Sequence, residues 1–561
     1  MNKTAIKNFA IWARNTLIKD TMYKARLLGV SADGIQEPLP NSTKDMQFFD
    51  VGTDTPYSIS GSAVQQRRGF VTALRQKAAQ SEYETAYRAL MEEVAYTWFN
   101  RLIAIRFMEV NGYLPSGIRV LSSESGKWEP DIVTTPFEAD LPFTEDEEIE
   151  ISHLKRENQN DTVFRLLFIK QCNALHDILP QLFETTTDYT ELLLNLSITD
   201  QDGVVCRLVH DIDEADFDVS RGGQVEIIGW LYQYYNTELK DETFKLLNKN
   251  VKVTKERLPS ATQLFTPDWI VRYMVENSLG RMWIQGHMKS PDQEEAMAKD
   301  FGWQYYLPEA AQELDVEAKL QDLRREYSKL RPEDLTVIDP CMGSGHILVY
   351  AFDVLMQIYR ANGYSDRDAA ELILEHNLYG LDIDDRAFQL AYFSVLMKAR
   401  QYSRRILSRK DETGRLNVPQ PHVYAIMESK EIGGSYKSAM GDFLLSEEHQ
   451  ETLNYLLDAF SNAKEYGSIL QLEERDYAEL MEAWQYTSSQ TVKDFNMTLW
   501  YSAVEHEIPK FIEQAIILTK KYDIVVTNPP YMGASNMNGC LSNYIKKEYP
   551  NSKSDLFAVF M

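Results

Sequence analysis

The stretch LTVIDPCMGSG, residues 335–345, decides the fold of the second half of the chain. An apolar run, Leu335 to Ile338, leads into a turn with two glycines, and the helical pattern Ile347 to Tyr359 follows directly. A strand, a glycine turn and a helix place backbone N–H groups where a ligand can lie against the main chain. The third glycine of G-x-G-x-x-G and the lysine of a P-loop are missing, which argues against a dinucleotide site and against NTP hydrolysis. A lone turn of this kind also occurs for packing alone.

Two further apolar runs repeat the pattern of strand followed by polar residues. They are NLYGLDID at 377–384 and YDIVVTNPP at 522–530, and helical stretches separate them. Strands that alternate with helices predict βαβ units, and therefore a parallel sheet with helices on both faces. The stretch 444–520 is longer than a crossover needs, and its periodicity predicts a helical insertion.

An acidic residue ends the second predicted strand. The tip of this strand is where a Rossmann-type fold binds ribose hydroxyls. Asp382 fits that position better than Asp384, which we expect to cap the following helix. Two capping aspartates remain an equally open interpretation.

The sequence Asn528-Pro529-Pro530-Tyr531 is the most specific signal in the chain. Two prolines give up two backbone donors, which leaves carbonyls to face a ligand. The Asn528 side-chain oxygen and the Pro529 carbonyl can together accept two hydrogen bonds from one exocyclic amino group. Tyr531 offers a flat face on which the ring of that group can stack. A rigid turn after a strand is the alternative.

The first 250 or so residues predict a different, mainly helical domain. The clearest element runs from Tyr83 to Val110, with apolar residues at steps of three and four, Ser81 as its N-cap and Gly112 as its stop. We expect an ordinary amphipathic helix here, a solvated loop around the acidic run 145–148, and an acidic surface loop at 210–216. The predicted domains are 1–255, mainly helical, and 256–561, α/β.

Composition narrows the function classes. The 561 residues carry 58 Lys+Arg and 84 Asp+Glu, a formal net charge of −26, which excludes a protein that coats nucleic acid through overall basicity. The four cysteines form no CxxC pair, and we expect neither a metal site nor a disulfide framework. No signal sequence and no apolar stretch of membrane-spanning length is apparent, so we expect a cytoplasmic protein without a membrane partner.

The motif D-P-x-x-G-S-G followed by N-P-P-Y resembles the amino-methyltransferases of DNA, which use S-adenosyl-L-methionine. Upstream, the run 263–267 resembles the F-T-P element of that family, whose loop holds the methionine end of the cofactor. The order of the three motifs is that of the γ class, whose members mostly methylate adenine. Over essentially its whole length, the sequence resembles those of the adenine-specific methyltransferases of BREX phage-exclusion systems.

This resemblance implies a Rossmann-like methyltransferase domain that marks self DNA by methylating the 6-amino group of a flipped-out adenine. The implied partners are double-stranded DNA and other proteins of the phage-exclusion system. The residues implied to act on the target amino group are Asn528, Pro529, Pro530 and Tyr531. Those implied to bind the cofactor are Phe265, Thr266, Pro267, Asp339, Pro340, Gly343, Gly345, Asp382 and Asp442.

Two departures from the family pattern leave alternatives open. Asp442 lies some 15 residues beyond the predicted third strand, His422 to Met427, at whose end the family places its motif III aspartate. The chain stops at 557–561, inside an apolar run, so we expect an N-terminal fragment whose recognition region is absent. Such a fragment could bind cofactor and partner proteins without catalysis. A protein-glutamine methyltransferase also uses N-P-P-Y, but those enzymes are shorter and lack the F-T-P element.

Overall fold

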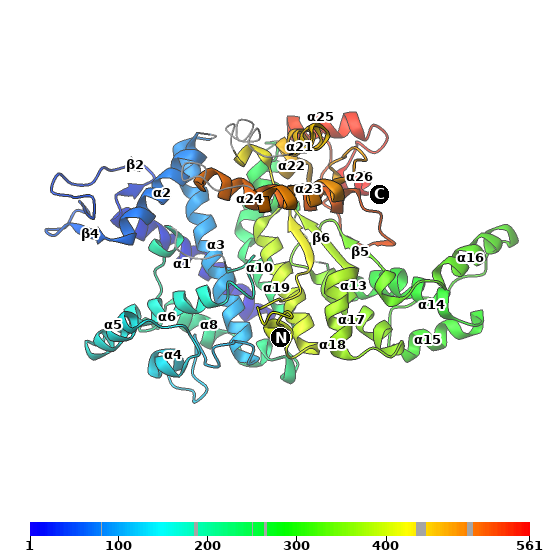
Figure 1. Cartoon of the computed structure of the whole chain (residues 1–561), viewed down its shortest axis with the longest axis horizontal. Helices are drawn as coiled ribbons and strands as arrows, with labels where there is room; N and C mark the ends of the chain where they lie inside the picture. The colour runs from blue at the N-terminus through cyan, green and yellow to red at the C-terminus, as the bar shows by residue number, and fades with distance from the viewer. Residues whose placement is uncertain (80, 184–188, 250, 263–265, 433–444, 491–497) are drawn as a thin grey trace. The chain divides into compact units, whose positions relative to one another are not determined.

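The structure, a computed structural model, describes the chain except residues 80, 184–188, 250, 263–265, 433–444 and 491–497 (Figure 1). The chain forms two compact units. The first comprises 1–238 together with 408–418, and the second comprises 239–407 together with 419–561. No helix in the described part of the chain is long and apolar enough to cross a membrane.

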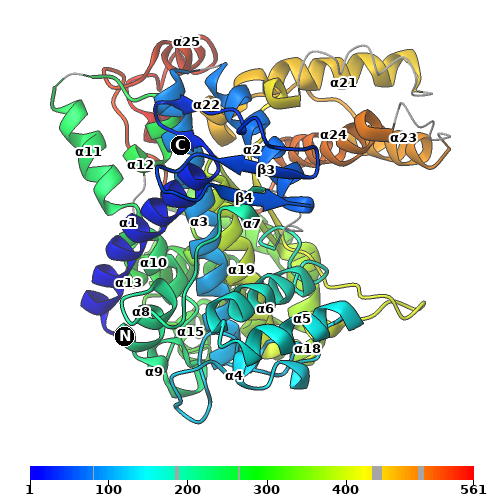
Figure 2. The same cartoon turned by 90° about the vertical axis from the view of Figure 1, so that its left-hand side faces the viewer.

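The first unit is mainly helical, with two small antiparallel hairpins. Its longest elements are α1 (Lys3–Leu27), α2 (Ser62–Ala78) and α3 (Tyr83–Val110). Figure 2 shows the hairpin β3–β4 (Met46–Phe49 with Tyr57–Ser60) beside α2, which it contacts. Its other strands and α-helices are β1 Val30–Ser31, β2 Gly34–Ile35, α4 Asp131–Thr134, α5 Glu145–Arg156, α6 Asn160–Ala174, α7 Tyr189–Leu192, α8 Val204–Asp211, α9 Glu214–Phe217 and α10 Ile227–Tyr235. The next helix, α11 (Thr237–Leu247), begins at the end of this unit and belongs mostly to the second.

Helix α3 has the predicted bounds but not the predicted surroundings. The predicted face is buried, yet every residue from Ala95 to Glu109 except Thr97 is buried as well. The helix is therefore enclosed on all sides over its second half, and the prediction of an ordinary amphipathic helix was wrong there. Ser81 is not the N-cap, because Glu82 occupies that position and the Ser81 hydroxyl donates instead to the Lys77 carbonyl. Gly112 ends the helix with a positive φ of 63°, as predicted.

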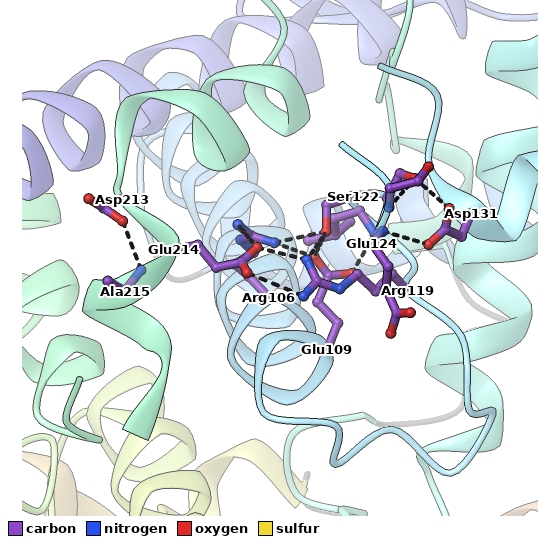
Figure 3. Close-up of polar contacts among 12 residues, drawn as sticks. Arg106, Glu109, Arg119, Ser122, Glu124, Asp131, Asp213, Glu214 and Ala215 are labelled. Atoms are coloured by element: carbon purple, nitrogen blue, oxygen red, sulfur yellow. Dashed lines mark hydrogen bonds and ion pairs between the residues drawn. The ribbon is translucent and has the colours of Figure 1, made fainter. Parts of the chain in front are cut away.

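Arg106 and Glu109, two charged residues buried on α3, belong to a network of hydrogen bonds and ion pairs (Figure 3). The Glu109 carboxylate accepts hydrogen bonds from Arg106 Nη1 at 2.8 Å, from Ser122 Oγ at 2.9 Å and from the backbone N–H groups of residues 120 and 121. Glu214 of α9 pairs with Arg119 at 2.7 Å and with Arg106 at 3.3 Å. Because each buried charge has a partner, the network ties the loop after α3 and the start of α9 to the core of this unit.

Two predicted loops of this unit are folded elements instead. The acidic run 145–148 is the first turn of α5, capped by Thr144 and Glu147 in a reciprocal capping box. The signal was Thr144 three residues before Glu147, and carboxylates are favourable at a helix N-terminus. In the segment 210–216, Asp213 caps α9, and the buried Asp216 accepts the Asn2 N–H at 2.8 Å. These carboxylates make structural hydrogen bonds, so the prediction of an acidic surface loop at 210–216 was wrong.

The second unit is built on a four-stranded parallel sheet in the order β7–β6–β5–β8. The strands are β5 Val337–Asp339, β6 Leu378–Asp382, β7 His422–Ala425 and β8 Ile524–Val525. The predicted parallel sheet is confirmed, although β8 covers only two residues of the predicted run 522–530. The helices of this unit are α12 Leu258–Thr262, α13 Asp268–Val275, α14 Arg281–His287, α15 Glu294–Asp300, α16 Leu314–Tyr327, α17 His346–Ala361, α18 Asp366–Leu372, α19 Asp385–Tyr402, α21 Glu447–Ala459, α22 Ala463–Tyr466, α23 Tyr477–Gln490, α24 Thr498–Thr519, α25 Gly539–Glu548 and α26 Leu556–Phe560.

Helices cover both faces of this sheet, as Figure 1 shows. Successive strand residues point to opposite faces. Ile338, Tyr379 and Leu381 share an apolar core with residues of α21, α23 and α24. Gly380 faces the other way, where a Cβ atom would lie 2.8 Å from Leu348 of α17, and α19 contacts β6 and β7 beside α17. The long segment between β7 and β8 therefore supplies one covering layer of the sheet.

Candidate active site

The candidate residues lie where three neighbouring parallel strands end. Asp382 ends β6, Asp339 ends β5, and Asn528 follows β8, whose pairing continues through the hydrogen bond from the Val526 N–H to the Ile338 carbonyl at 3.0 Å. Neighbouring strands are about 4.8 Å apart. The chain passes from β5 to β6 on one side and returns to β8 on the other, so β5 borders a topological switch point. In open α/β sheets, ligands bind outside the carboxyl ends of the strands at such a point.

The glycine turn joins the ends of β5 and β6. The Gly343 N–H donates to Asp382 Oδ2 at 2.9 Å, and the Met342 N–H donates to the Leu381 carbonyl at 3.0 Å. Gly343 and Gly345 both have positive φ, 53° and 80°, which side chains disfavour. A Cβ atom at Gly345 would lie 3.0 Å from the Ala391 Cα of α19, whereas one at Gly343 would meet nothing within 4 Å. Gly345 thus allows close packing of the helices, and Gly343 leaves its backbone open to a ligand.

Asp382 is half-buried, and backbone N–H groups hold its carboxylate. Besides Gly343, the Asp384 N–H donates to Asp382 Oδ1 at 2.8 Å. The pKa of Asp382 is raised to about 7, mainly by burial; the charge of Asp384 also raises it, and the backbone hydrogen bonds partly offset the rise. Asp384 itself caps α19 by accepting the Arg386 N–H, which confirms that part of the prediction.

Asp339 is almost fully buried, with 1% of its surface exposed. Its Oδ1 accepts the Cys341 N–H at 3.1 Å. Its Oδ2 has no hydrogen bond of normal geometry to the described residues, but the Thr527 hydroxyl, which follows β8, lies close enough to interact with this carboxylate and to lower its pKa. Burial raises the pKa of Asp339 to about 7. Buried carboxylate oxygens are usually fully hydrogen-bonded, so Asp339 Oδ2 fits a site that receives a ligand with donor groups.

The residue that follows the F-T-P element, Asp268, lies near the residue that follows the glycine turn, His346. Thr266 is buried and Pro267 is exposed, while Phe265 lies outside the described residues. Asp268 opens α13 and approaches His346, the first residue of α17, at 3.8 Å. Hydrogen bonding to His346 lowers the pKa of Asp268 to about 2, and Arg272 contributes as well. Asp268 directly follows the F-T-P element, and His346 directly follows the glycine turn. Their positions next to these two motifs were the only sequence signal from which the contact could have been predicted.

The N-P-P-Y turn presents an exposed aromatic ring. Asn528, Pro529 and Pro530 are half-buried, and Tyr531 is 53% exposed. The Tyr531 ring lies 5.7 Å from the ring of Phe557, centroid to centroid. The chain after the turn is held in place, because the Met532 N–H donates to Asp555 Oδ1 at 3.1 Å. A flat face is therefore available next to two half-buried carbonyl-bearing prolines.

Other residues near the sheet edge complete the description. Asp442 lies outside the described residues. Burial, and after it the charges of Asp339 and Asp382, raise the pKa of the Cys341 thiol, so Cys341 is poorly suited to act as a thiolate. Glu428, three residues beyond β7, was not predicted; it is buried and pairs with Lys255 at 2.5 Å. Nothing in the local sequence marked this pair, because its partners lie far apart in the chain.

Known proteins resemble this chain along its whole length. Residues 376–561 match the Eco57I restriction-modification methylase family. The chain is 44% identical, over 580 aligned residues, to the adenine-specific methyltransferase PglX of Lacticaseibacillus casei (strain Zhang). The chain is a relative of PglX. The predicted resemblance to adenine-specific methyltransferases is thereby confirmed.

A second and a third relative show how far this similarity reaches. The adenine-specific methyltransferase BrxX of Escherichia coli O9:H4 (strain HS) is 37% identical to the chain over 591 residues. As with PglX, the alignment covers 100% of this chain and 45% of the relative, so the chain spans about half the length of these proteins. A putative type II restriction enzyme and methyltransferase of Methanocaldococcus jannaschii is 22% identical over 54% of the chain.

Proposed function

We propose that this chain carries the cofactor-binding and target-base-binding residues of a site-specific DNA adenine methyltransferase that uses S-adenosyl-L-methionine. The observation that carries this proposal is the sheet edge on which Asp382, Asp339 and Asn528 follow neighbouring strands. In this proposal, the predicted domain 256–561 is a Rossmann-like methyltransferase domain and the predicted domain 1–255 is a helical domain that docks partner proteins. By their contacts, residues 239–255 belong to the second unit and residues 408–418 to the first. The protein acts in the cytoplasm and marks self DNA in phage defence.

The residues at the ends of β5 and β6 fit the cofactor. A Cβ atom at Gly343 would meet nothing within 4 Å, and Asp339 Oδ2 is a buried acceptor with no hydrogen bond of normal geometry to the described residues. Asp382, at the tip of the second strand, has the position that binds ribose hydroxyls in Rossmann-type folds. Thr266 and Pro267, with Phe265, would hold the methionine end. When bound, the cofactor supplies an electrophilic methyl group.

The N-P-P-Y turn would hold the base that receives the methyl group. The Asn528 side-chain oxygen and the Pro529 carbonyl accept hydrogen bonds from the 6-amino group and so orient its lone pair. The exposed ring of Tyr531 stacks on the extruded adenine. The chain uses no covalent enzyme intermediate, which agrees with the raised pKa of the Cys341 thiol. Catalysis then rests on positioning and on preorganised acceptors.

Extrusion of the adenine needs more protein than this chain supplies. Flipping costs a few kcal/mol, which contacts to the flanking DNA must offset. Nonspecific affinity for DNA comes from neutralised phosphates, and a chain with a net charge of −26 provides it poorly. We therefore propose that DNA recognition belongs mainly to the remaining length of the PglX relatives.

The test is tritium transfer from labelled cofactor to adenine-containing duplex. It compares this chain with a longer protein that adds the remaining length of the relatives. In the longer protein, Asn528→Ala should lower the rate by about 10²–10³, by analogy with the loss of one preorganised donor, while cofactor affinity stays unchanged. Gln321→Ala removes an exposed amide from α16 and serves as the matched control. Wild-type rates in the Asn528→Ala protein would contradict the proposed role, and transfer to free peptide instead of DNA would favour a protein-glutamine methyltransferase.

A further inference from the structure

A short segment between α21 and α23 touches both halves of the candidate site. It comprises residues 464–471, which include the end of α22 and the 3₁₀ turn Gly467–Ile469, and we call it the bridge segment. It belongs to the predicted helical insertion, and none of its residues was predicted to take part in function. All of its contacts described below lie within the second unit.

On one side, the bridge segment contacts the loops that follow β5 and β6. We call these the cofactor loops, because they carry residues that we propose to bind S-adenosylmethionine. The Ser468 hydroxyl donates to the Pro340 carbonyl at 2.5 Å, directly beside Asp339. Gly467 approaches the loop after β6 so closely that a Cβ atom there would lie 3.1 Å from Ile383 Cγ2. Lys464 pairs with Asp385, in the first turn of α19, at 2.8 Å. The loop after β5, the loop after β6 and the start of α19 are thus all held by one short segment.

On the other side, the bridge segment holds the chain that follows N-P-P-Y. The Asn538 side chain, which caps α25, donates to Glu465 at 2.8 Å. The Tyr466 ring stacks on Tyr544 of α25 with centroids 3.9 Å apart, and the Tyr466 hydroxyl lies 3.4 Å from Cys540 Sγ. These contacts begin seven residues after Tyr531.

A buried apolar cluster fixes the same junction. Ile469 of the bridge segment packs with Met532, Met537, Leu541 and Leu556, all of which follow the N-P-P-Y turn. Packed cores shift between discrete arrangements and do not deform continuously. A displacement of the Pro340 carbonyl would therefore reach α25 through the bridge segment.

We propose that the bridge segment couples occupation of the cofactor loops to the placement of α25 and the N-P-P-Y turn, with Ser468 as a positioning residue. The inference rests on the proposed function, because the ligand at the cofactor loops is taken to be S-adenosylmethionine. Coupling of this kind is reciprocal, so a base held beside Asn528 would raise cofactor affinity by the same factor.

The chain carries its own reporter for this coupling. Cys540 is partly exposed and contacts Tyr466, whereas Cys172 and Cys206 are buried and provide unreactive references. The experiment measures alkylation of each cysteine by iodoacetamide, with peptides resolved by mass spectrometry, with and without saturating S-adenosylmethionine. Calorimetry on the same samples gives the cofactor Kd. In the wild-type chain, cofactor should change the Cys540 rate by about threefold or more.

Three variants distinguish coupling from a merely structural role. Ser468→Ala should weaken cofactor binding about three- to tenfold, the usual worth of one neutral hydrogen bond, and abolish the effect of saturating cofactor on Cys540. Ser468→Thr keeps the hydroxyl and should restore the effect. Ser328→Ala removes a comparable hydroxyl-to-carbonyl bond, 2.9 Å to Arg325 at the end of α16, and should behave as wild type. Thermal melting checks that all variants are folded.

The outcomes separate the inference from the function on which it rests. Failure of the wild-type chain to bind S-adenosylmethionine would overturn both. Normal cofactor binding with no change at Cys540, or a change that persists in full in Ser468→Ala at saturating cofactor, would overturn the coupling and leave the proposed function standing.

Discussion

At the residue scale, the proposed role of Asp339 predicts that cofactor binding depends on pH. Its pKa is raised to about 7, so at pH 6 the group is mostly protonated and at pH 8 mostly ionised. A ligand with net positive charge prefers the ionised form, and its affinity must rise with pH through this window and level off above it. We expect S-adenosylmethionine affinity to rise up to about tenfold between pH 6 and pH 8 for one such group.

Titration calorimetry at pH 6, 7 and 8 checks this expectation. Asp339→Asn should bind more weakly at pH 8 and show a flatter pH profile, with the remaining slope due to Asp382, whose pKa is also raised to about 7. Asp322→Asn changes an exposed carboxylate on α16 and should reproduce the wild-type profile. Identical slopes in wild type and Asp339→Asn would mean that Asp339 does not face the cofactor.

At the element scale, the second half of α3 should stabilise the first unit through its buried charges. Glu109→Ala removes an acceptor that serves Arg106, Ser122 and two backbone N–H groups, and leaves a buried guanidinium with fewer partners. Loss of one partner of a buried pair costs about 3–5 kcal/mol. The control is Glu84→Ala on the same helix, whose exposed pair with Arg88 contributes about 0–1 kcal/mol.

Urea denaturation monitored in the first unit measures both changes. If Glu109→Ala lowered the free energy of unfolding no more than Glu84→Ala does, the network in Figure 3 would contribute nothing beyond an exposed pair.

Elements that depend on local sequence patterns could be predicted from the sequence, whereas their surroundings could not. The strands β5 and β6, the glycine turn and the bounds of α3 depend on local patterns, and all were predicted closely. The start of α5 was also local but was missed, because the charge of residues 145–148 hid the capping box at Thr144. Periodicity along α3 could not show that other elements enclose it.

Contacts between distant residues were beyond any local pattern. The approach of Asp268 to His346, the pair of Lys255 with Glu428 and the bond from Ser468 to Pro340 each join segments 78 to 173 residues apart. Within the candidate site, the sequence predicted the residues at strand ends, where chemistry and topology coincide. The residues that hold those strand ends in place emerged only from the fold.

At the scale of the whole molecule, the central claim is that the ends of β6, β5 and β8 form a site for S-adenosylmethionine within this chain. The chain spans about half the length of its relatives, yet it contains every strand end that the proposal requires. Cofactor binding should therefore be separable from DNA methylation, which we expect to need the remaining length.

The most direct test is calorimetric titration of the 561-residue chain with S-adenosylmethionine, beside Asp382→Ala. The account predicts one site per chain in the wild type. It predicts a loss of about 1–3 kcal/mol of binding free energy in Asp382→Ala, because the ribose hydroxyls and the Gly343 N–H lose their acceptor. Absence of binding by the folded wild-type chain, or equal affinity in Asp382→Ala, would contradict the account.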